Sequence, residues 1–255
     1  MILWILLFIL VLAISFVLAV QSMKDYQEIP SQAGEEYGIF LIRKPFQFSS
    51  DVLASLHRDC LNLGLIISFE RLVKGAKSAL VIYGPKKLLV NHQKMLDLLE
   101  LEDYATNAKD GISAWEVGLR GSKKPTTEDV KNYFKMFPSL SENEQFWWQL
   151  VLSPNKETVF PDGNKETLFP DGNKDLPNTT KSFQAQIRAV LLSPDQDKRV
   201  NLAKMLQNLV PEKLTKLPKA FSDAQIIDFY QKRSLRRDKN NPLLTSEEVL
   251  QLLLL

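Results

Sequence analysis

The sequence has one cysteine and two histidines among its 255 residues, and this scarcity excludes several kinds of site. A single cysteine cannot form an internal disulfide, and Cys60, His57 and His92 cannot supply the four ligands of a zinc module. None of the ten glycines is followed by lysine, so the Gly-Lys step of a Walker A phosphate loop is missing. The G-x-S-x-G, H-E-x-x-H and G-x-G-x-x-G motifs are missing as well. We therefore expect no enzymatic activity, no bound metal and no cofactor.

Charge is absent from the first 23 residues, although the whole chain carries 32 Lys and Arg against 30 Asp and Glu. Residues 1–20 are almost all apolar, and as a helix they would span about 30 Å, the thickness of a bilayer core. No positive residue precedes this run, as a signal peptide would require, whereas Lys24, Arg43 and Lys44 follow it. These features predict a single-pass transmembrane anchor over 1–23 that contacts membrane lipid through 1–20, with the remaining chain in the cytoplasm.

The chain after the anchor has the composition of a folded α+β protein. Residues 24–36 read as a polar tether, and residues 37–120 then show the order β-α-β-β-α-β of a ferredoxin-like unit. This unit is expected to use strands over 37–43, 65–73, 78–83 and 112–119, and helices over 51–63 and 86–99. The second helix is expected to bury Leu88, Leu89, Met95, Leu96 and Leu99.

The order partly repeats over 121–255, which predicts a second, related α+β unit. Its expected helices cover 128–137, 195–209, 222–231 and 245–254, and its strands over 146–152 and 183–192 are expected to pair as a hairpin. The second of these strands alternates in polarity, so Gln184, Gln186 and Arg188 are expected on a face exposed to water. Residues 154–180 form an insertion in this hairpin.

The insertion contains two nearly identical copies of nine residues, at 155–163 and 164–172, which differ only at Val159 and Leu168. Each copy ends in the turn-forming sequence Pro-Asp-Gly. We interpret the insertion as a flexible hairpin tip, and the alternative is a loop that binds a partner through Phe160 and Phe169.

Three groups of side chains could carry chemistry, and each also has a structural interpretation. His57 and Cys60 share one helical face and are expected in the core, whereas His92 is expected to be solvated. Glu70 and Glu116 lie on strands where two carboxylates could do acid–base work, but ion pairs on the sheet explain them more simply. Phe146, Trp147 and Trp148 are expected to divide between the two faces of their strand, in the core and at an interface.

The most basic segment of the chain runs from residue 231 to residue 239. It could contact nucleic acid or another partner through Lys232, Arg233, Arg236, Arg237 and Lys239. It could equally be a solvated linker between two helices, because the chain as a whole is almost neutral.

Several short segments, taken in order, resemble the N-terminal region of the large conjugal-transfer ATPases, which are similar to type IV secretion ATPases. The resemblance is strongest to membrane-anchored versions from bacteria with reduced genomes. The segments are YGIFLIRKP (37–45), LIISFERLV (65–73), SALVIY (78–83), KKLLVNHQKMLDLL (86–99), Asp103-Tyr104, EQFWWQLVLSP (144–154), FQAQIRA (183–189) and LTSEEVL (244–250).

This resemblance covers residues 37–255, and the chain stops where the ATPase core of the family would begin. The nucleotide-binding residues of the family therefore have no counterparts here. The resemblance implies a non-enzymatic, membrane-anchored accessory or scaffold protein that forms homo-oligomers or docks to a P-loop ATPase of the secretion or DNA-translocating kind. The alternative function is a membrane-tethered module that binds nucleic acid through residues 232–239.

Overall fold

The architecture is taken from a computed structural model of the full chain. The structure describes residues 4, 8, 10–16, 28–29, 35–44, 49–107, 111–119, 140–155, 157–159, 165–167, 182–208, 214–216, 222–236 and 241–253.

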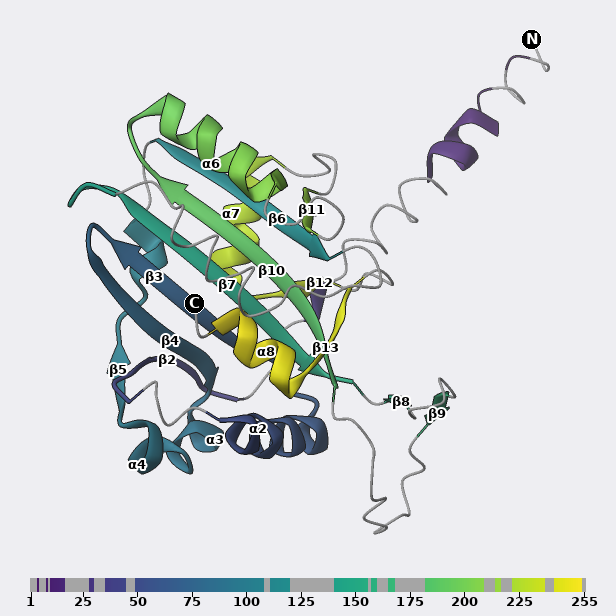
Figure 1. The fold of residues 1–255 in the computed structure, drawn as a ribbon. Helices are drawn as coiled ribbons and strands as arrows, with labels where there is room; N and C mark the ends of the chain where they lie inside the picture. Colours follow the sequence, from purple (N-terminus) through teal and green to yellow (C-terminus); the bar gives the residue numbers. More distant parts are fainter. Residues whose placement is uncertain are drawn as a thin grey trace.

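One continuous antiparallel sheet organises the described part of the chain (Figure 1). Eight of its strands follow one another in the order β11-β6-β10-β7-β3-β4-β2-β5, and β13 pairs with the start of β10. The strands are β2 (Tyr37–Ile42), β3 (Ile67–Lys74), β4 (Lys77–Pro85), β5 (Leu98–Leu101), β6 (Ile112–Leu119), β7 (Gln145–Pro154), β10 (Ser182–Leu192), β11 (Leu214–Lys216) and β13 (Leu243–Thr245). The chain therefore has an α+β fold, as the sequence predicts.

The first half of the sheet has the predicted β-α-β-β-α-β order, but its fourth strand is not the predicted one. It comprises β2, α2 (Ser50–Leu63), β3, β4, the short helices α3 (Lys86–Val90) and α4 (Gln93–Leu96), and β5. The strands lie in the order β5-β2-β4-β3. The fourth position belongs to β5, whereas the segment predicted for it, β6, pairs with β10 and β11.

The prediction of a single helix over 86–99 was also wrong, because this segment contains two short helices and then β5. Asp97 adopts a left-handed conformation, with φ of 51°, which ends α4 and allows Leu98–Leu101 to pair with β2 as an edge strand. Leu88, Leu89 and Leu96 are buried as expected. Met95 of α4 is exposed, and so is Leu99, which lies in the strand that replaces the last turn of the predicted helix.

The second half of the sheet repeats this strand arrangement. Its strands β6, β7, β10 and β11 lie in the order β11-β6-β10-β7, and α6 (Gln196–Asn208) connects β10 to β11. The hairpin of β7 with β10 is confirmed over its full length. The helix predicted over 128–137 lies outside the described residues. The two halves join where β3 pairs with β7, from Ile67 opposite Leu152 to Lys74 opposite Gln145.

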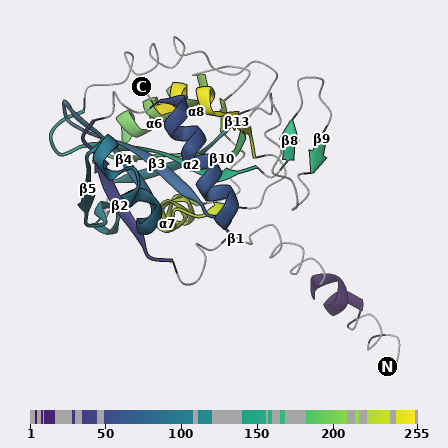
Figure 2. The same ribbon diagram turned by 90° about the horizontal axis from the view of Figure 1, so that it is seen from below.

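Helices cover both faces of the sheet. The helices α2, α6 and α8 (Ser246–Leu253) pack on one face, and α7 (Asp223–Lys232) lies on the other (Figure 2). The main core lies beneath α2, α6 and α8, and it contains Leu53, Leu56 and Cys60 from α2 together with Phe146 and Trp148 from β7.

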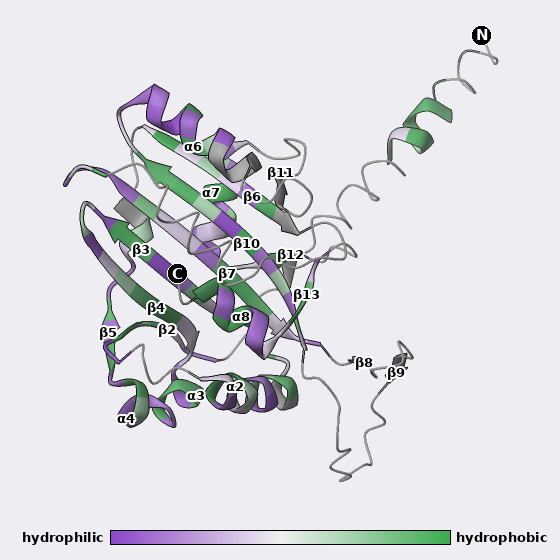
Figure 3. Ribbon diagram, in the orientation of Figure 1, coloured by the Kyte–Doolittle hydropathy of each residue, from purple (hydrophilic) through white to green (hydrophobic). Residues whose placement is uncertain are grey.

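The face under α7 has a second, smaller core. Trp147 packs there against Tyr104 and Tyr230, with ring centroids 5.3 Å and 5.5 Å away, which confirms its expected separation from Phe146 and Trp148. Gln186 and Arg188 of β10 are also buried on this face, so the expected wet face of that strand was wrong. Hydrophilic residues consequently interrupt the hydrophobic central strands (Figure 3).

Helix ends follow the capping signals in the sequence. Ser49 caps α2, and Gly64 ends it in a left-handed conformation with φ of 65°. Ser222 and Gln225 form a reciprocal capping box at the start of α7, and Thr245 and Glu248 form another before α8. These helices therefore begin where their side chains satisfy the first backbone N–H groups.

The N-terminal segment is described only in part, at residues 4, 8 and 10–16, and residues 10–16 are helical. Among the described residues, none of the helices has both the length and the hydropathy that a membrane span requires. Most of the predicted anchor lies outside this description. Farther along, β1 (Glu28–Ile29) pairs with β12 (Leu235–Arg236) in the region predicted as a tether.

The repeat insertion contributes a small sheet of its own. In it β8 (Glu157–Val159), from the first copy, pairs with β9 (Lys165–Thr167), from the second. Phe160 and Phe169, which the alternative interpretation assigns to partner binding, lie outside the described residues.

Candidate functional site

A row of polar side chains crosses the face of the sheet that α7 covers. Glu70 of β3 lies opposite Gln149 of β7, Gln149 opposite Arg188 of β10, and Arg188 opposite Glu116 of β6. Directly paired residues of antiparallel strands share one face, so the four side chains form a continuous line from the first half of the sheet to the second. All four are buried, and Glu70 and Gln149 have no exposed surface.

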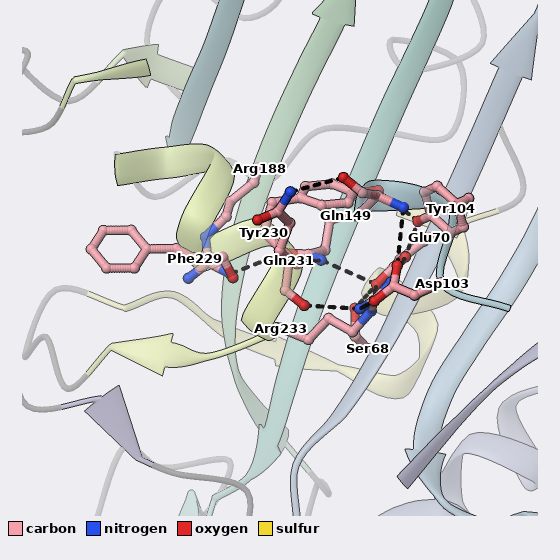
Figure 4. A network of polar contacts seen from close by, with 11 residues as sticks. Ser68, Glu70, Asp103, Tyr104, Gln149, Arg188, Phe229, Tyr230, Gln231 and Arg233 are labelled. Carbon is pink, nitrogen blue, oxygen red and sulfur yellow. Dashed lines mark hydrogen bonds and ion pairs between the residues drawn. The ribbon is translucent and has the colours of Figure 1, made fainter. Parts of the chain in front are cut away.

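One end of the row is held by Arg233, which follows α7. Its Nε donates to Glu70 Oε1 at 2.9 Å, and its two terminal nitrogens donate to the carboxylate of Asp103 at 2.7 Å and 3.1 Å (Figure 4). The guanidinium also lies over the ring of Tyr83, 4.8 Å from its centroid. Arg233 has a left-handed backbone with φ of 50°, an uncommon conformation for a residue other than glycine, which turns the chain back onto the sheet.

Arg188 occupies the centre of the row and is 1% exposed. It donates to the side-chain oxygens of Gln149 and Gln186, both at 2.9 Å, and to the backbone carbonyl of Ser234 at 2.6 Å. The amide of Gln149 in turn donates to Glu70 at 3.1 Å and to the carbonyl of Tyr230 at 2.9 Å. The sheet is thus hydrogen-bonded to the backbone at the end of α7.

The other end of the row is held by Arg236 of β12. Its guanidinium donates to Glu116 at 3.2 Å, and its backbone N–H donates to Gln186 Oε1 at 2.8 Å. The carbonyl of Arg236 accepts from Asn241 at 2.8 Å. Two arginines from one short segment therefore hold carboxylates from the two halves of the sheet.

Charges balance within this polar row and its partners. The three arginines, at 188, 233 and 236, are matched by the carboxylates of Asp103, Glu70 and Glu116. Burial alone would raise the pKa of Asp103, but the hydrogen bonds and the positive charge of Arg233 lower it. Burial likewise would lower the pKa of Arg233, and its two carboxylate partners raise it above the ordinary value. Pairing thus offsets the desolvation of these groups.

Two tyrosines complete the site. The hydroxyl of Tyr104 donates to Glu70 and lies 2.9 Å from the hydroxyl of Tyr230. Burial, followed by the nearby charge of Glu70, raises the pKa of both tyrosines well above the ordinary value. Both hydroxyls consequently remain protonated at neutral pH and act as hydrogen-bond donors.

The contacts of Glu70 are those of a side chain that holds several elements of the fold together. Its two oxygens accept hydrogen bonds from four side chains: Ser68, Tyr104, Gln149 and Arg233. A general acid or base must instead exchange a proton with a reactant within hydrogen-bond reach. Glu70 and Glu116 both form ion pairs, as expected, although their partners come from the segment after α7 and not from the neighbouring strand.

The structure separates the residues of the predicted basic surface. Arg233 and Arg236 are 3% and 8% exposed and hold buried carboxylates, so they do not form a surface for nucleic acid or another partner. Lys232 is exposed and pairs with Asp228 one helical turn earlier, at 2.7 Å. Arg237 and Lys239 lie outside the described residues.

The histidines and the cysteine are all buried. Cys60 has no exposed surface, and burial raises the pKa of its thiol to about 12. His57 Nε2 lies 2.9 Å from the carbonyl of Ser182, so it connects α2 to the start of β10 in the core as expected. The expected solvation of His92 was wrong: it is 7% exposed, in the turn between α3 and α4, with Nε2 3.7 Å from Asp59.

A separate buried carboxylate, Glu144, holds the start of β7 to the start of α6. It accepts from the backbone N–H of Ser141 at 2.7 Å, from the hydroxyl of Ser193 at 2.6 Å and from Lys198 Nζ at 2.7 Å. Burial alone would raise the pKa of Glu144, but these hydrogen bonds outweigh burial and lower the pKa to about 2.

Stability is expected to depend on the ionisation of Glu144 in acid. A carboxylate whose pKa is lowered by folding stabilises the protein above its unfolded pKa of 4.5, and this contribution is lost as the pH falls from 4.5 toward 2. Glu144→Gln is expected to lower the free energy of unfolding at neutral pH by about 1.5–3 kcal/mol and to flatten its decline in acid.

Denaturant unfolding of the full chain in detergent, repeated between neutral pH and pH 2, measures this effect. Glu142→Gln, at an exposed position two residues earlier, is the matched control. It should leave unchanged both the free energy of unfolding at neutral pH and the decline of this free energy in acid. Equal pH profiles for Glu144→Gln and the parent would contradict the prediction.

These observations define the chain as an α+β protein whose two similar half-sheets share one buried polar row. Comparison with known protein families found no family model that matches the sequence. A search of the curated proteins likewise found no significant match.

Proposed function

We propose that the chain is a membrane-anchored, non-enzymatic scaffold with a cytoplasmic α+β domain. The observation that carries this proposal is the exposure of the N-terminal apolar residues. Seven large side chains there are between 51% and 73% exposed: Trp4, Phe8, Leu10, Val11, Leu12, Ile14 and Phe16. Large apolar side chains exposed in this way need an apolar environment, and the uncharged sequence over 1–23 suits the interior of a bilayer.

The domain is proposed to consist of two ferredoxin-like units that share one sheet. In the first half, the chain order β2, β3, β4, β5 becomes the spatial order β5-β2-β4-β3. In the second half, β6, β7, β10 and β11 adopt the corresponding order β11-β6-β10-β7. The second strand of each unit forms the junction, and the unit boundary falls between β5 and β6.

The polar row supports a scaffolding role for this domain. It crosses the junction between the two units, and the segment after α7 bonds to both of them through Arg233 and Arg236. A buried network in which each charge has a partner fixes the relative position of the elements that it joins. The domain would therefore present its outer surfaces to a partner as one rigid body.

The partner is proposed to be a P-loop ATPase of a DNA-translocating or type IV secretion-like system, or a second copy of the chain. The support for this choice is the resemblance of residues 37–255 to the region that precedes such an ATPase core. The chain would then contribute attachment and position, while the partner would bind and hydrolyse the nucleotide.

Cross-linking in native membranes tests this function. A photo-cross-linking side chain at Arg58, on the exposed side of α2, should yield an adduct with a P-loop ATPase or with a second copy. The purified full chain in detergent should hydrolyse no ATP. ATP hydrolysis that a single substitution in the domain abolishes would overturn the proposed non-enzymatic role.

A further inference from the structure

The tether between the proposed anchor and the domain is attached to the domain at two places. Glu28 and Ile29 form β1, which pairs with Arg236 and Leu235 of β12. Farther along, the carbonyl of Glu36 accepts a hydrogen bond from the backbone N–H of Lys86 at 2.8 Å. The first of these attachments determines where the chain leaves the domain toward the anchor.

That attachment lies on the face of the sheet that α7 covers. Leu235 is fully buried and packs with Ile66 and Val151, and Arg236 holds Glu116 of the polar row. The helices α6 and α8 lie on the opposite side of the sheet from α7 (Figure 2). The chain therefore leaves the domain toward its N-terminus from the α7 side.

The chain between the anchor and β1 is short compared with the domain. Seven residues, 21–27, separate the apolar run from β1, so residues 20 and 28 lie at most about 28 Å apart when this chain is fully extended. A domain of about 230 residues has a radius of gyration of about 17 Å, which corresponds to a diameter of about 45 Å. The connecting chain is too short to pass around the domain to the α2, α6 and α8 side.

We propose that the side of the domain that carries α7 and β12 faces the lipid surface, and that the side covered by α2, α6 and α8 faces away from it. This inference rests on the proposed membrane anchor. In this orientation, the outer surfaces of α2, α6 and α8 are accessible to a partner that approaches from the cytoplasm. It also makes the pairing of β1 with β12 the contact that orients the domain.

Fluorescence quenching by lipids that carry a quencher on the head group tests the orientation. A fluorophore is attached to the full chain through Lys232→Cys on α7, or through the matched variants Arg58→Cys on α2 and Lys204→Cys on α6. All three positions are exposed, and the native Cys60 is fully buried. In phosphatidylcholine vesicles, quenching at position 232 is expected to be at least about two-fold stronger than at 58 and 204, because α2 and α6 pack on the opposite face of the sheet from α7.

Two further measurements separate the orientation from the anchor itself. If the chain floats with the vesicles but quenching is equal or reversed, the proposed orientation is overturned and the proposed membrane anchor is not. If the chain does not float, the anchor and the orientation are both overturned. Ile29→Pro removes a backbone donor from β1 and should reduce the difference in quenching between the positions. Ile29→Val keeps the donor and should preserve the difference, and a difference unchanged by Ile29→Pro would overturn the orienting role of β1.

Discussion

Replacing Arg233 with methionine is expected to lower the free energy of unfolding by about 3–5 kcal/mol, the usual cost of removing one partner of a buried ion pair. The guanidinium is almost completely buried and holds both Glu70 and Asp103. Methionine fills a similar volume but donates no hydrogen bond, so Glu70 would remain buried with less compensation for its desolvation. Denaturant unfolding of the full chain in detergent measures the loss.

The neighbouring lysine provides a matched control for this prediction. Lys232 precedes Arg233 in the sequence, is exposed, and pairs with Asp228 on the surface of the same helix. Lys232→Met should therefore cost less than about 0.5 kcal/mol. If the two variants lost equal stability, the buried pair would not have the importance assigned to it.

A double substitution tests whether the loss comes from the pairing itself. Glu70→Gln removes the charge that Arg233 compensates and retains a side chain of similar shape. The combination Arg233→Met with Glu70→Gln should be more stable than the sum of the two single losses predicts, because the second change removes the uncompensated charge left by the first. Simple additivity would show that Arg233 stabilises the fold through contacts other than Glu70.

Placing two arginines in the apolar N-terminal run is expected to release the protein from the membrane. The double variant Leu10→Arg with Ile14→Arg introduces both charges near the middle of the proposed span. Each arginine at a helix centre costs about 2.5–3.5 kcal/mol of insertion free energy, so the pair costs about 5–7 kcal/mol. Alkaline extraction of membranes that contain the full chain should retain the parent in the pellet and release the double variant.

The control for this experiment adds the same charge outside the apolar run. Gln21→Arg with Met23→Arg places two arginines on the flank that already carries Lys24, where positive charge favours the proposed orientation. This variant should remain in the pellet. Release of the parent by alkali, or retention of all three proteins, would contradict a membrane span at the N-terminus.

Local signals predicted most of the described secondary structure. The helix expected over 51–63 is confirmed as α2, and the residues that bound it, Ser49 and Gly64, lie within a few positions of its apolar face. The strand at 98–101 was missed because its leucines continue the apolar pattern of the preceding helix. Asp97, which has a left-handed backbone conformation, separates the two elements. Glycine is the usual residue in this conformation, so an aspartate does not predict it from the sequence.

The polar row was only partly visible in the sequence. Glu70, Gln149 and Arg188 stand out as polar residues within apolar strands, but an alternating pattern is also typical of a strand with one face in water. The arginines were harder to place, since Arg233 and its partner Glu70 are separated by 163 positions. From the sequence alone, a segment rich in arginine and lysine is predicted to be exposed, because the distant carboxylates that pair with it are not known.

Local sequence patterns predict the α+β class, the hairpin of 146–152 with 183–192 and most helix boundaries, because these features depend on the properties of neighbouring residues. The tertiary structure selects the strand that completes each half of the sheet, and it buries both faces of β10. It also decided that Arg233 and Arg236 belong to the interior. These outcomes depend on which distant segments meet, and on whether α7 and β12 cover the charged face that the strands leave open.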